Sequence, residues 1–435
     1  MASLITSQPT MFTSSVASNV TITGIGTAFT SGSTFTFSGG SATLVTAVNG
    51  STAIVAITAS TAGTQTLTCT DSSGGTCSVT VRAPIFVPAN NSNFLYSHQS
   101  WQQVGGGSPV GITGCADAYV KILANNGPFR LRFDTSHYGS ATPPRILVRL
   151  DSWAGGGLTY YGPAVDGIYL PVATDAFIYH NIEIFQTNPT TAWDPTASNS
   201  DFLRFLGIEQ AGSTIDVYPY QANAKKVVIS SDSWGAGGTG DGDNQGYPRN
   251  AHTSYLSNAM QQLGVEWGNS SYAGQGMAKA AGAVPQAATS IFNINAGVTR
   301  DFSATDLVIF QQGNNYNTSD TAASLIALMV PMINTLHAAN SNLKVVFLQA
   351  YTTPPNSGPP TPGQRYYDGF AGAVAGCNNP SRAFFFNNVG ANIPAGFLNS
   401  SHPYGSAPAF NGQTIVEQIR SVLWPASGGN NGVHS

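Results

Sequence analysis

Charged side chains are scarce in this sequence. Asp, Glu, Lys and Arg make up 8% of the 435 residues, against roughly a quarter in ordinary soluble proteins. The net charge is −4 and no cluster of Lys or Arg is present, so a nucleic-acid-binding protein is not indicated. No apolar run reaches the roughly 20 residues that a membrane-spanning helix needs. The N-terminal stretch MASLITSQPTMFTSS lacks a basic start and a continuous apolar segment, so we do not interpret it as a signal peptide.

Cysteine is also rare, with four residues in all. No CxxC motif and no Cys/His cluster occurs, so we predict neither a zinc site nor a bound cofactor. Cys69 and Cys77 flank the segment TDSSGGT, which is typical of a hairpin turn. These two residues are either bridged across the hairpin or are small unbridged core residues, and the sequence leaves both alternatives open. Cys115 and Cys377 stand alone.

Glycine is abundant, with 48 residues, and Ser, Thr and Asn take the place of charged side chains. Apolar residues make up 42%, which is enough to build hydrophobic cores, and the length favours two to four domains. This composition suits an extracellular or virion-associated protein built from many short strands. A removed signal, another export route or release of a phage structural protein by lysis would each account for such a location.

The first region, residues 1–84, contains short segments in which apolar and polar residues alternate, among them VTIT, TFTF and AIVAI. Turns rich in Gly and Ser separate these segments. Alternation with a period of two at this spacing predicts an antiparallel β-sandwich, and the length suits an immunoglobulin-like domain. The segment APIFVPANNSN that follows is interpreted as the linker that leaves this domain.

The second region, residues 85–222, is again rich in predicted strands and in aromatic residues. We predict a second β-sandwich, of the jelly-roll type. Exposed aromatics in such a domain could stack on sugar rings, or they could belong to its core. The aromatics in question are Trp101, Trp153, Tyr160, Tyr161 and Trp193.

The pattern changes in the third region, residues 223–427, where apolar strands alternate with longer amphipathic segments. This alternation predicts a parallel, doubly wound α/β sheet with helices on both faces, a three-layer flavodoxin-like arrangement. The strands are expected at 225–230, 265–269, 306–312, 343–349 and 383–386, and the helices at 252–263, 319–340, 364–375 and 410–423. Residues 428–435 are expected to form a flexible tail.

Polar groups follow several of these strands, at the edge where doubly wound sheets bind ligands. Ser233 follows the first strand, Gly274 the second and Asn315 the third, and His402 precedes the last helix. A serine hydroxyl needs an adjacent base, for which histidine is suited because its pKa lies near neutral pH. Backbone N–H groups and an Asn side chain can stabilise the oxyanion of acyl transfer. The four groups together indicate nucleophilic hydrolysis.

These segments resemble the conserved blocks of the SGNH/GDSL hydrolase superfamily. KKVVISSDSWGAG resembles block one, DLVIFQQGNN block three and NSSHP block five. The resemblance implies that Ser233 is the nucleophile, that Gly274 and Asn315 are oxyanion donors together with the Ser233 N–H, and that His402 is the general base. Asn399 stands where the family has an Asp. Either its side chain or a backbone carbonyl near residues 399–400 would then support His402.

A sandwich followed directly by the hydrolase domain resembles carbohydrate esterases, which remove acetyl groups from polysaccharides. We therefore predict two N-terminal β-sandwich domains followed by an SGNH hydrolase domain, and the resemblance implies an acetylated polysaccharide or oligosaccharide as substrate. Attachment to a virion or cell surface through the N-terminal domain would keep the enzyme near its polymer. The rival hypotheses are a phage tail or surface protein with a degenerate esterase domain, and a lipase or acyltransferase of the same fold.

Overall fold

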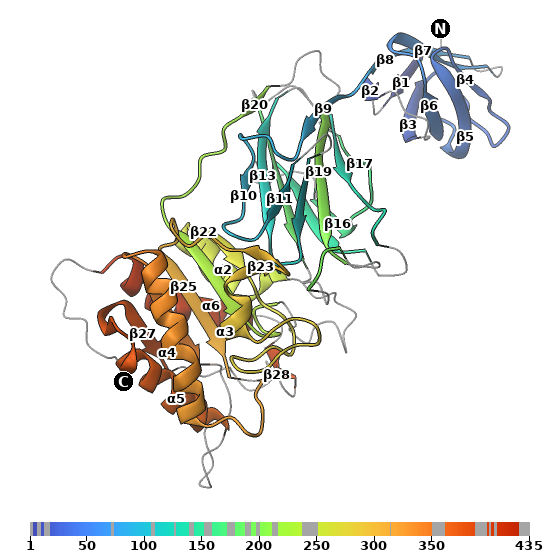
Figure 1. Ribbon diagram of the computed structural model, residues 1–435. Helices are drawn as coiled ribbons and strands as arrows, with labels where there is room; N and C mark the ends of the chain where they lie inside the picture. The colour runs from blue at the N-terminus through green and yellow to red at the C-terminus, as the bar shows by residue number, and fades with distance from the viewer. Residues whose placement is uncertain are drawn as a thin grey trace.

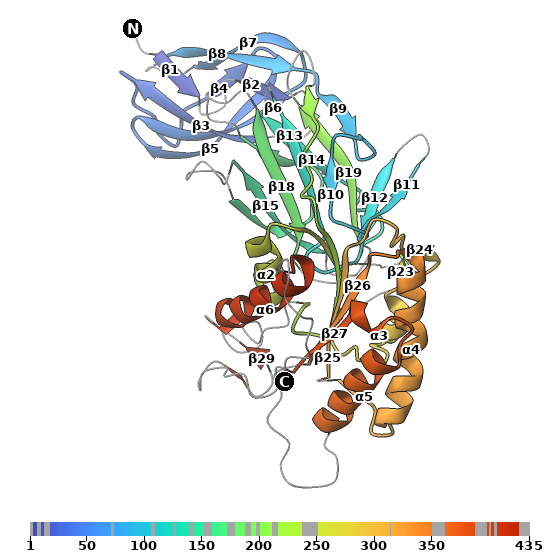
Figure 2. The same cartoon turned by 90° about the vertical axis from the view of Figure 1, so that its left-hand side faces the viewer.

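The computed structural model divides the chain into three bodies, two built of strands and one of strands and helices (Figure 1). The first body lies at one end of the molecule, and the second lies between it and the third (Figures 1 and 2). The structure describes residues 3–6, 10–12, 18–70, 74–105, 109–125, 128–138, 143–151, 159–171, 179–187, 193–196, 201–210, 216–236, 251–313, 315–349, 362–387, 398–399, 402–403 and 407–425. The predicted tail at 428–435 therefore lies outside the described residues.

The first body consists of two four-stranded sheets packed around one core. One sheet has the order β1-β3-β6-β5 and the other β2-β8-β7-β4, with β2 parallel to β8. Buried and half-buried residues alternate along β6, as the sequence predicts for a sandwich strand. The strands are β1 Ser3–Thr6, β2 Thr10–Phe12, β3 Ser18–Ile25, β4 Phe35–Phe37, β5 Gly40–Asn49, β6 Thr52–Ala59, β7 Gly63–Cys69 and β8 Thr76–Arg82.

The two cysteines of this body are free thiols, which decides between the alternatives that the sequence left open. The β7–β8 hairpin pairs Cys77 with Leu67, whereas Cys69 pairs with Phe35 on β4. Cys69 and Cys77 are therefore not cross-strand partners, and they act as small apolar residues. Cys69 is buried in the core and Cys77 packs against it.

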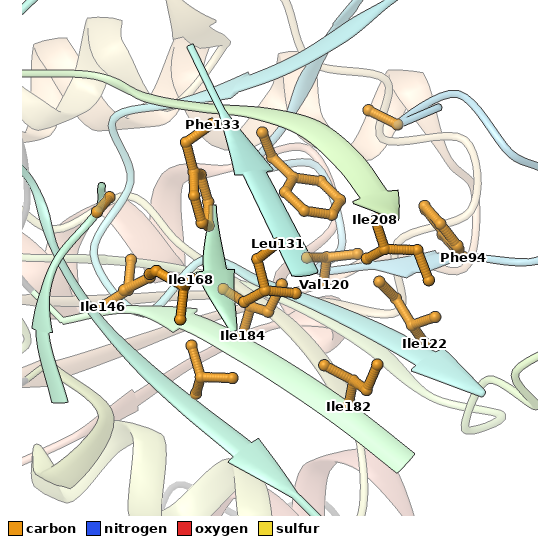
Figure 3. Close-up of a cluster of buried hydrophobic side chains, with 14 of the residues drawn as sticks. Phe94, Val120, Ile122, Leu131, Phe133, Ile146, Ile168, Ile182, Ile184 and Ile208 are labelled. Atoms are coloured by element: carbon orange, nitrogen blue, oxygen red, sulfur yellow. The ribbon is translucent and has the colours of Figure 1, made fainter. Parts of the chain in front are cut away.

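The second body is a sandwich of two six-stranded sheets, with the core of aliphatic and Phe side chains that Figure 3 shows between them. One sheet follows the path β10-β13-β18-β15-β16 with β20 paired to β13, and the other follows β11-β12-β19-β14-β17 with β9 paired to β19. The strands are β9 Ile85–Pro88, β10 Leu95–Tyr96, β11 Gln102–Val104, β12 Val110–Thr113, β13 Tyr119–Ala124, β14 Phe129–Phe133, β15 Arg145–Leu150, β16 Thr159–Pro163, β17 Ile168–Leu170, β18 His180–Gln186, β19 Leu203–Gln210 and β20 Val217–Tyr218.

The segment interpreted as a linker is in fact part of this second sandwich, so that interpretation is wrong. Strand β9 pairs with β19 in the register Val87 to Ile208, and the Val87 side chain is buried in the core. Gly207 makes the pairing possible, because a Cβ there would lie 2.0 Å from the Val87 carbonyl oxygen. The apolar run Ile-Phe-Val is buried by strand pairing, a long-range contact that the local sequence does not reveal.

The third body contains a five-stranded parallel sheet in the order β22-β21-β25-β26-β27. Helices α2 and α6 cover one face and α3, α4 and α5 cover the other (Figure 2). This order is that of flavodoxin-like sheets, as predicted. The elements are β21 Lys226–Ser231, α2 Tyr255–Leu263, β22 Glu266–Asn269, α3 Ala287–Ser290, β23 Asn293–Asn295, β24 Val298–Thr299, β25 Leu307–Gln312, α4 Ala322–Ala339, β26 Lys344–Gln349, α5 Pro362–Gly376, β27 Ala383–Phe386, β28 Leu398–Asn399, β29 His402–Pro403 and α6 Ala407–Leu423, with short 3-10 turns at Ala251–Thr253 and Pro380–Arg382.

Helix boundaries differ from the sequence prediction where capping residues act. The helix expected from His252 begins at Tyr255, because the Ser254 hydroxyl accepts a hydrogen bond from the Ser257 N–H and caps the first turn. The helix expected from residue 319 begins at Ala322, where Thr321 and Ser324 form a reciprocal capping box. Neither Ser254 nor Thr321 stands out from the many hydroxyl residues around it, so the sequence pattern places these helix starts too early.

Helix α4 is long and apolar enough to cross a membrane by length and composition, with 18 residues and a mean hydropathy of 1.5. In the structure its apolar stripe packs against the sheet and α5, and the side chains of Leu325, Met329, Ile333 and Leu336 are fully buried. A helix that supplies the core of a folded domain meets the same two criteria, and α4 has that role here.

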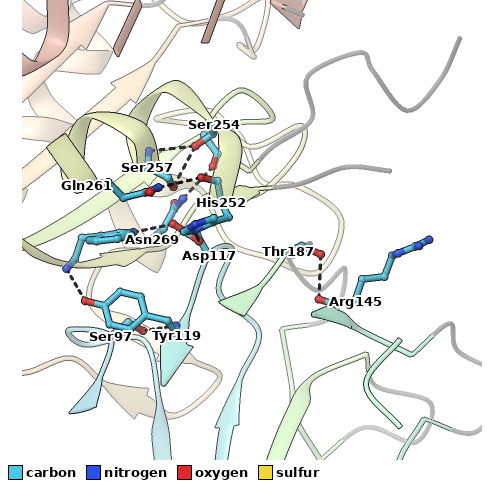
Figure 4. Close-up of polar contacts among 12 residues, drawn as sticks. Ser97, Asp117, Tyr119, Arg145, Thr187, His252, Ser254, Ser257, Gln261 and Asn269 are labelled. Carbon is cyan, nitrogen blue, oxygen red and sulfur yellow. Dashed lines mark hydrogen bonds and ion pairs between the residues drawn. The ribbon is translucent and has the colours of Figure 1, made fainter. Parts of the chain in front are cut away.

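The second and third bodies share a buried polar interface (Figure 4). Asp117 of the sandwich is fully buried, and its carboxylate accepts from Trp267 Nε1 at 2.9 Å and contacts His252 Nδ1 at 2.9 Å. Tyr119 donates to the buried Glu266 carboxylate, which also accepts from Asn223 Nδ2 at 2.9 Å. Because buried charges require such partners, the two bodies are held together by specific contacts.

A second group of contacts at this interface involves Arg300, which is 4% exposed. Its Nε donates to the carbonyl of Gln99 in the sandwich at 2.8 Å, and its Nη1 donates to the carbonyl of Ile291 at 2.8 Å. On β22, a Cβ at Gly268 would lie 1.8 Å from the carbonyl oxygen of His98, so the sandwich lies directly against this edge of the sheet. The edge strand β22 is therefore covered by the sandwich.

Candidate active site

The candidate nucleophile Ser233 lies in a tight turn directly after β21. The buried carboxylate of Asp232 accepts a hydrogen bond from the Trp234 N–H at 2.9 Å, and its carbonyl accepts from the Ala236 N–H at 3.0 Å. Ser233 itself is half-buried. Asp232 thus fixes the turn. Trp234 is 2% exposed and packs in the core against Tyr255.

Ser231, the last residue of β21, holds this turn to the sheet. Its hydroxyl donates to the Gln311 side chain on the neighbouring strand β25 and accepts from the Gly235 N–H at 3.2 Å. The Ser231 side chain therefore joins β21, β25 and the nucleophile turn.

Gly235 has no room for a side chain. A Cβ there would lie 2.5 Å from Ser231 Cβ and 2.8 Å from Ser271 Oγ. We therefore expect Gly235→Ala to displace the nucleophile and to lower kcat by roughly tenfold to a hundredfold, because small misplacements of reacting groups are costly. Steady-state kinetics on p-nitrophenyl acetate would measure the loss.

The double variant S231G/G235A is the matched control. It removes the Ser231 side chain that the new methyl group would meet, so it should recover part of the lost kcat. If Gly235→Ala has wild-type kinetics, or if the double variant is no faster than Gly235→Ala although Ser231→Gly alone keeps wild-type kinetics, the steric explanation is wrong.

The loop after β22 packs directly against the nucleophile turn. Asn269, fully buried at the end of β22, donates from Nδ2 to the Gly235 carbonyl at 2.9 Å. The Tyr272 N–H donates to the Ser231 carbonyl at 3.1 Å. Gly274 follows two residues later with φ +83°, a left-handed conformation that favours glycine. The candidate oxyanion donor Gly274 therefore lies on a loop bonded to the nucleophile segment.

The loop after β25 carries Asn315 and lies against the loop after β22, which carries Gly274. A Cβ at Gly276 would lie 2.1 Å from the Asn315 carbonyl oxygen, so the two loops are in close contact. Tyr366 of α5 donates to that carbonyl at 3.4 Å, and burial raises the pKa of its hydroxyl, which stays protonated as a donor. Asn317 and Asp320 close the loop, with the Asn317 N–H donating to the Asp320 carboxylate at 2.9 Å.

Two of the predicted oxyanion donors have no hydrogen-bond partner among the described residues. In the part of the chain that the structure describes, no hydrogen bond engages the backbone N–H of Gly274 or the side-chain amide of Asn315. Both groups are half-buried, at the carboxyl edge of the sheet. Polar groups left without partners at such an edge are what a developing oxyanion requires.

The predicted base and its support lie on the short hairpin of β28 and β29 before α6. The backbone register pairs Asn399 with His402. The side chains of both residues lie outside the described part of the structure, as does Asn314. The three predicted segments with Ser233, Gly274 and Asn315 are thus in contact with one another. Of the fourth segment, with His402, the structure describes only the backbone pairing of β28 with β29.

Several supporting residues of the site were not singled out from the sequence. Gln311 and Gly276 act through contacts between segments that are far apart in the chain. Only their positions at or just after strand ends could have drawn attention to them.

Among the described residues, no group of three or more His, Cys, Asp or Glu side chains could hold a metal ion.

Solved structures with a similar fold include two family two carbohydrate esterases. The enzyme from Cellvibrio japonicus superimposes with a TM-score of 0.62 and 13% identity, over 78% of this chain and 98% of that one. The enzyme from Clostridium thermocellum, solved with cellohexaose, gives 0.58 and 16% identity, over 76% and 99%. The chain has the SGNH/GDSL fold, in the form seen in carbohydrate esterases.

The salicylyl-acyltransferase SsfX3 of a tetracycline biosynthetic pathway is also similar, with a TM-score of 0.53 and 11% identity, over 79% of this chain and 98% of that one. No protein-family model matches the sequence, and no curated protein matches it. The superpositions include almost the whole of each similar structure, whereas about a fifth of this chain has no counterpart in them.

Proposed function

We propose that the protein is a serine esterase that removes O-acetyl groups from a polysaccharide. The observation that carries the proposal is the contact of three loops at the carboxyl edge of the parallel sheet. The three loops carry Ser233, Gly274 and Asn315, and they contact one another through neighbouring residues. We infer that the Ser233 hydroxyl, the Gly274 N–H and the Asn315 amide act together, since a nucleophile and hydrogen-bond donors are what acyl transfer from an ester requires.

In the proposed mechanism Ser233 Oγ attacks the acetyl carbonyl carbon while His402 takes the hydroxyl proton. The N–H groups of Ser233 and Gly274 and the side chain of Asn315 stabilise the oxyanion. His402 then returns the proton to the departing sugar oxygen, which leaves an acetyl ester on Ser233. Water, deprotonated by His402, attacks this ester and releases acetate, and Ser233 regains its proton.

Asn399 is proposed to support His402 by accepting a hydrogen bond from its ring, without contributing charge. Asn399→Ala should then lower kcat roughly fivefold, which corresponds to the loss of one hydrogen bond of about 1 kcal/mol. Asn399→Asp should shift the acidic limb of the kcat/KM profile to higher pH, because a carboxylate stabilises the protonated imidazole. Unchanged profiles in both variants would remove Asn399 from the mechanism and leave a backbone carbonyl near 399–400 in its place.

The choice of acetylated carbohydrate is supported by the similar structures. Two of them are family two carbohydrate esterases, and one was solved with a bound cello-oligosaccharide. The superposition with the first of these structures covers 78% of this chain, which is more than the hydrolase region alone. We propose that the second sandwich, residues 85–222, is the jelly-roll-like partner of a hydrolase domain at 223–427.

We further propose that residues 1–84 form an immunoglobulin-like domain. The β1-β3-β6-β5 sheet opposite β2-β8-β7-β4 supports this assignment, since such domains place four strands on one sheet and three or more on the other. With one Asp and one Arg, this domain is close to uncharged. Attachment to a virion or a cell surface, with the enzyme working outside the cell, is the role we propose for it.

A second candidate function is acyl transfer to an acceptor other than water. The similarity to an acyltransferase favours it, because the same nucleophile and oxyanion donors serve both reactions. A lipase would use these groups as well, with longer acyl chains. A tail or surface protein with a degenerate site would hydrolyse no ester at all.

Release of acetate separates these functions. The full-length protein is incubated with acetylated xylan, acetylated cello-oligosaccharides and p-nitrophenyl esters of 2 to 12 carbons, and free acetate and acylated products are quantified. We expect acetate from the carbohydrates and a preference for the shortest ester. A preference for long esters would favour a lipase, acetylation of an added alcohol would favour a transferase, and no reaction with any ester would overturn the enzymatic proposal.

A further inference from the structure

A tryptophan of the second sandwich lies against the loop that carries Gly274. Trp193, in the connection between β18 and β19, packs edge to face on Tyr272, with ring centroids 6.1 Å apart and planes at 76°. Tyr272 is 2% exposed, and its N–H is bonded to the Ser231 carbonyl at the end of β21. The Trp193 ring is thus one side chain away from the segment that leads into the nucleophile.

The backbone around Trp193 is held in place on both sides. The Trp193 carbonyl accepts a hydrogen bond from the Ala296 N–H at 3.0 Å, which ties it to the β23–β24 hairpin of the third body. Asp194 accepts from the Thr196 N–H at 2.8 Å and from the Thr196 hydroxyl at 2.7 Å, and Arg204 donates to the Pro195 carbonyl. The indole is therefore presented from a fixed turn.

Trp193 is half-buried and Asp194 is exposed, whereas Tyr272 and Pro195 beneath them are buried. Part of the indole consequently faces solvent beside the loop of Gly274. An aromatic surface with one adjacent carboxylate suits a pyranose ring, which offers an apolar C–H face and hydroxyl donors.

We propose that Trp193 is a stacking platform for a sugar ring of the polymeric substrate, contributed by the second sandwich to the rim of the hydrolase site. The proposal rests on the esterase function proposed above and deepens it, because it makes the substrate a carbohydrate chain with at least one ring beyond the acetylated one. Asp194 would accept a hydrogen bond from a hydroxyl of the stacked ring.

The test compares Trp193→Ala, Trp193→Phe and the control Trp424→Ala. Trp424 is exposed at the end of α6, and the neighbouring Val422 carbonyl accepts from Lys344 at the start of β26, so the control lies at the opposite edge of the sheet. KM and kcat are measured on acetylated xylo- and cello-oligosaccharides and on p-nitrophenyl acetate. Binding of unacetylated xylohexaose and cellohexaose is measured separately by calorimetry.

Trp193→Ala should raise KM for the acetylated oligosaccharides on the order of tenfold. Its effect on kcat and on p-nitrophenyl acetate kinetics should be much smaller, and it should weaken hexaose binding by about the same factor as it raises KM. Trp193→Phe should retain most of the affinity, and Trp424→Ala all of it. Equal losses on p-nitrophenyl acetate and on oligosaccharides would show a structural role instead and overturn the proposal.

The calorimetric measurement is independent of ester chemistry, so failure of the esterase proposal and failure of the platform can be told apart. If the protein binds a hexaose through Trp193 but hydrolyses no ester, the sugar-binding proposal stands and the esterase proposal is wrong. If it hydrolyses p-nitrophenyl acetate but binds neither hexaose, or binds a hexaose equally well after Trp193→Ala, the sugar-binding proposal is wrong.

Discussion

Ser233→Ala should lower kcat on p-nitrophenyl acetate and on acetylated oligosaccharides by about 10⁴-fold or more. The Ser233 hydroxyl is the only side chain in the proposed mechanism that forms a bond to the acyl carbon, and Ala offers no atom that could replace it. KM should change little, because the oxyanion donors and the sugar contacts remain. Stopped assays sensitive to trace acetate are needed to quantify the residual rate.

His402→Ala should cost about as much as Ser233→Ala, and the double variant should be no slower than either single one. A nucleophile and its base act as a unit, so once one of them is removed, removal of the other should not lower kcat further. Thermal unfolding of all three variants controls for folding. Multiplicative losses in the double variant, or a His402→Ala enzyme with nearly wild-type kcat, would show that His402 is not the base for Ser233.

Asn315→Ala should lower kcat by about 10²–10³-fold with little effect on KM, because its amide would stabilise the oxyanion more than the ground-state carbonyl. Asn315→Asp should be at least as slow, since a carboxylate repels the developing charge. Kinetics on p-nitrophenyl acetate measure both.

The neighbouring Tyr316 offers the control for this prediction. Its ring lies on the same loop, with the Arg365 guanidinium 5.9 Å from the ring centroid, and Tyr316→Phe keeps that ring. This variant should therefore retain wild-type kinetics. If Asn315→Ala raised KM and left kcat unchanged, Asn315 would be a ground-state contact and not an oxyanion donor.

The parallel sheet could be predicted because its strands are continuous apolar runs buried on both faces, such as residues 227–229, 307–310 and 345–348. The candidate site followed from the same pattern, since Ser233 and Asn315 each come just after a strand and must meet at one edge. The short hairpin β23–β24 and the four-residue helix α3 were not predicted, because elements of this length carry too few residues to show a periodicity.

Contacts between the bodies could not be predicted from the sequence. Asp117 and His252 are 135 positions apart, and nothing in their local sequence marks them as a buried pair. The same holds for β9, whose apolar residues were interpreted as a linker although they pair with a strand about 120 positions later. The free thiols of Cys69 and Cys77 depend on a hairpin register that local turn residues do not fix.

The buried interface between the second and third bodies limits how this protein can be dissected. Cutting the chain near residue 222 would remove Asp117, the partner of Trp267 and His252. It would also remove Tyr119, which donates to Glu266, and the Gln99 carbonyl, which accepts from Arg300. Polar groups orphaned in this way cost about 1–3 kcal/mol each. A minimal catalytic fragment should therefore start at residue 85, and recombination in evolution would be expected to transfer both bodies as one inherited unit.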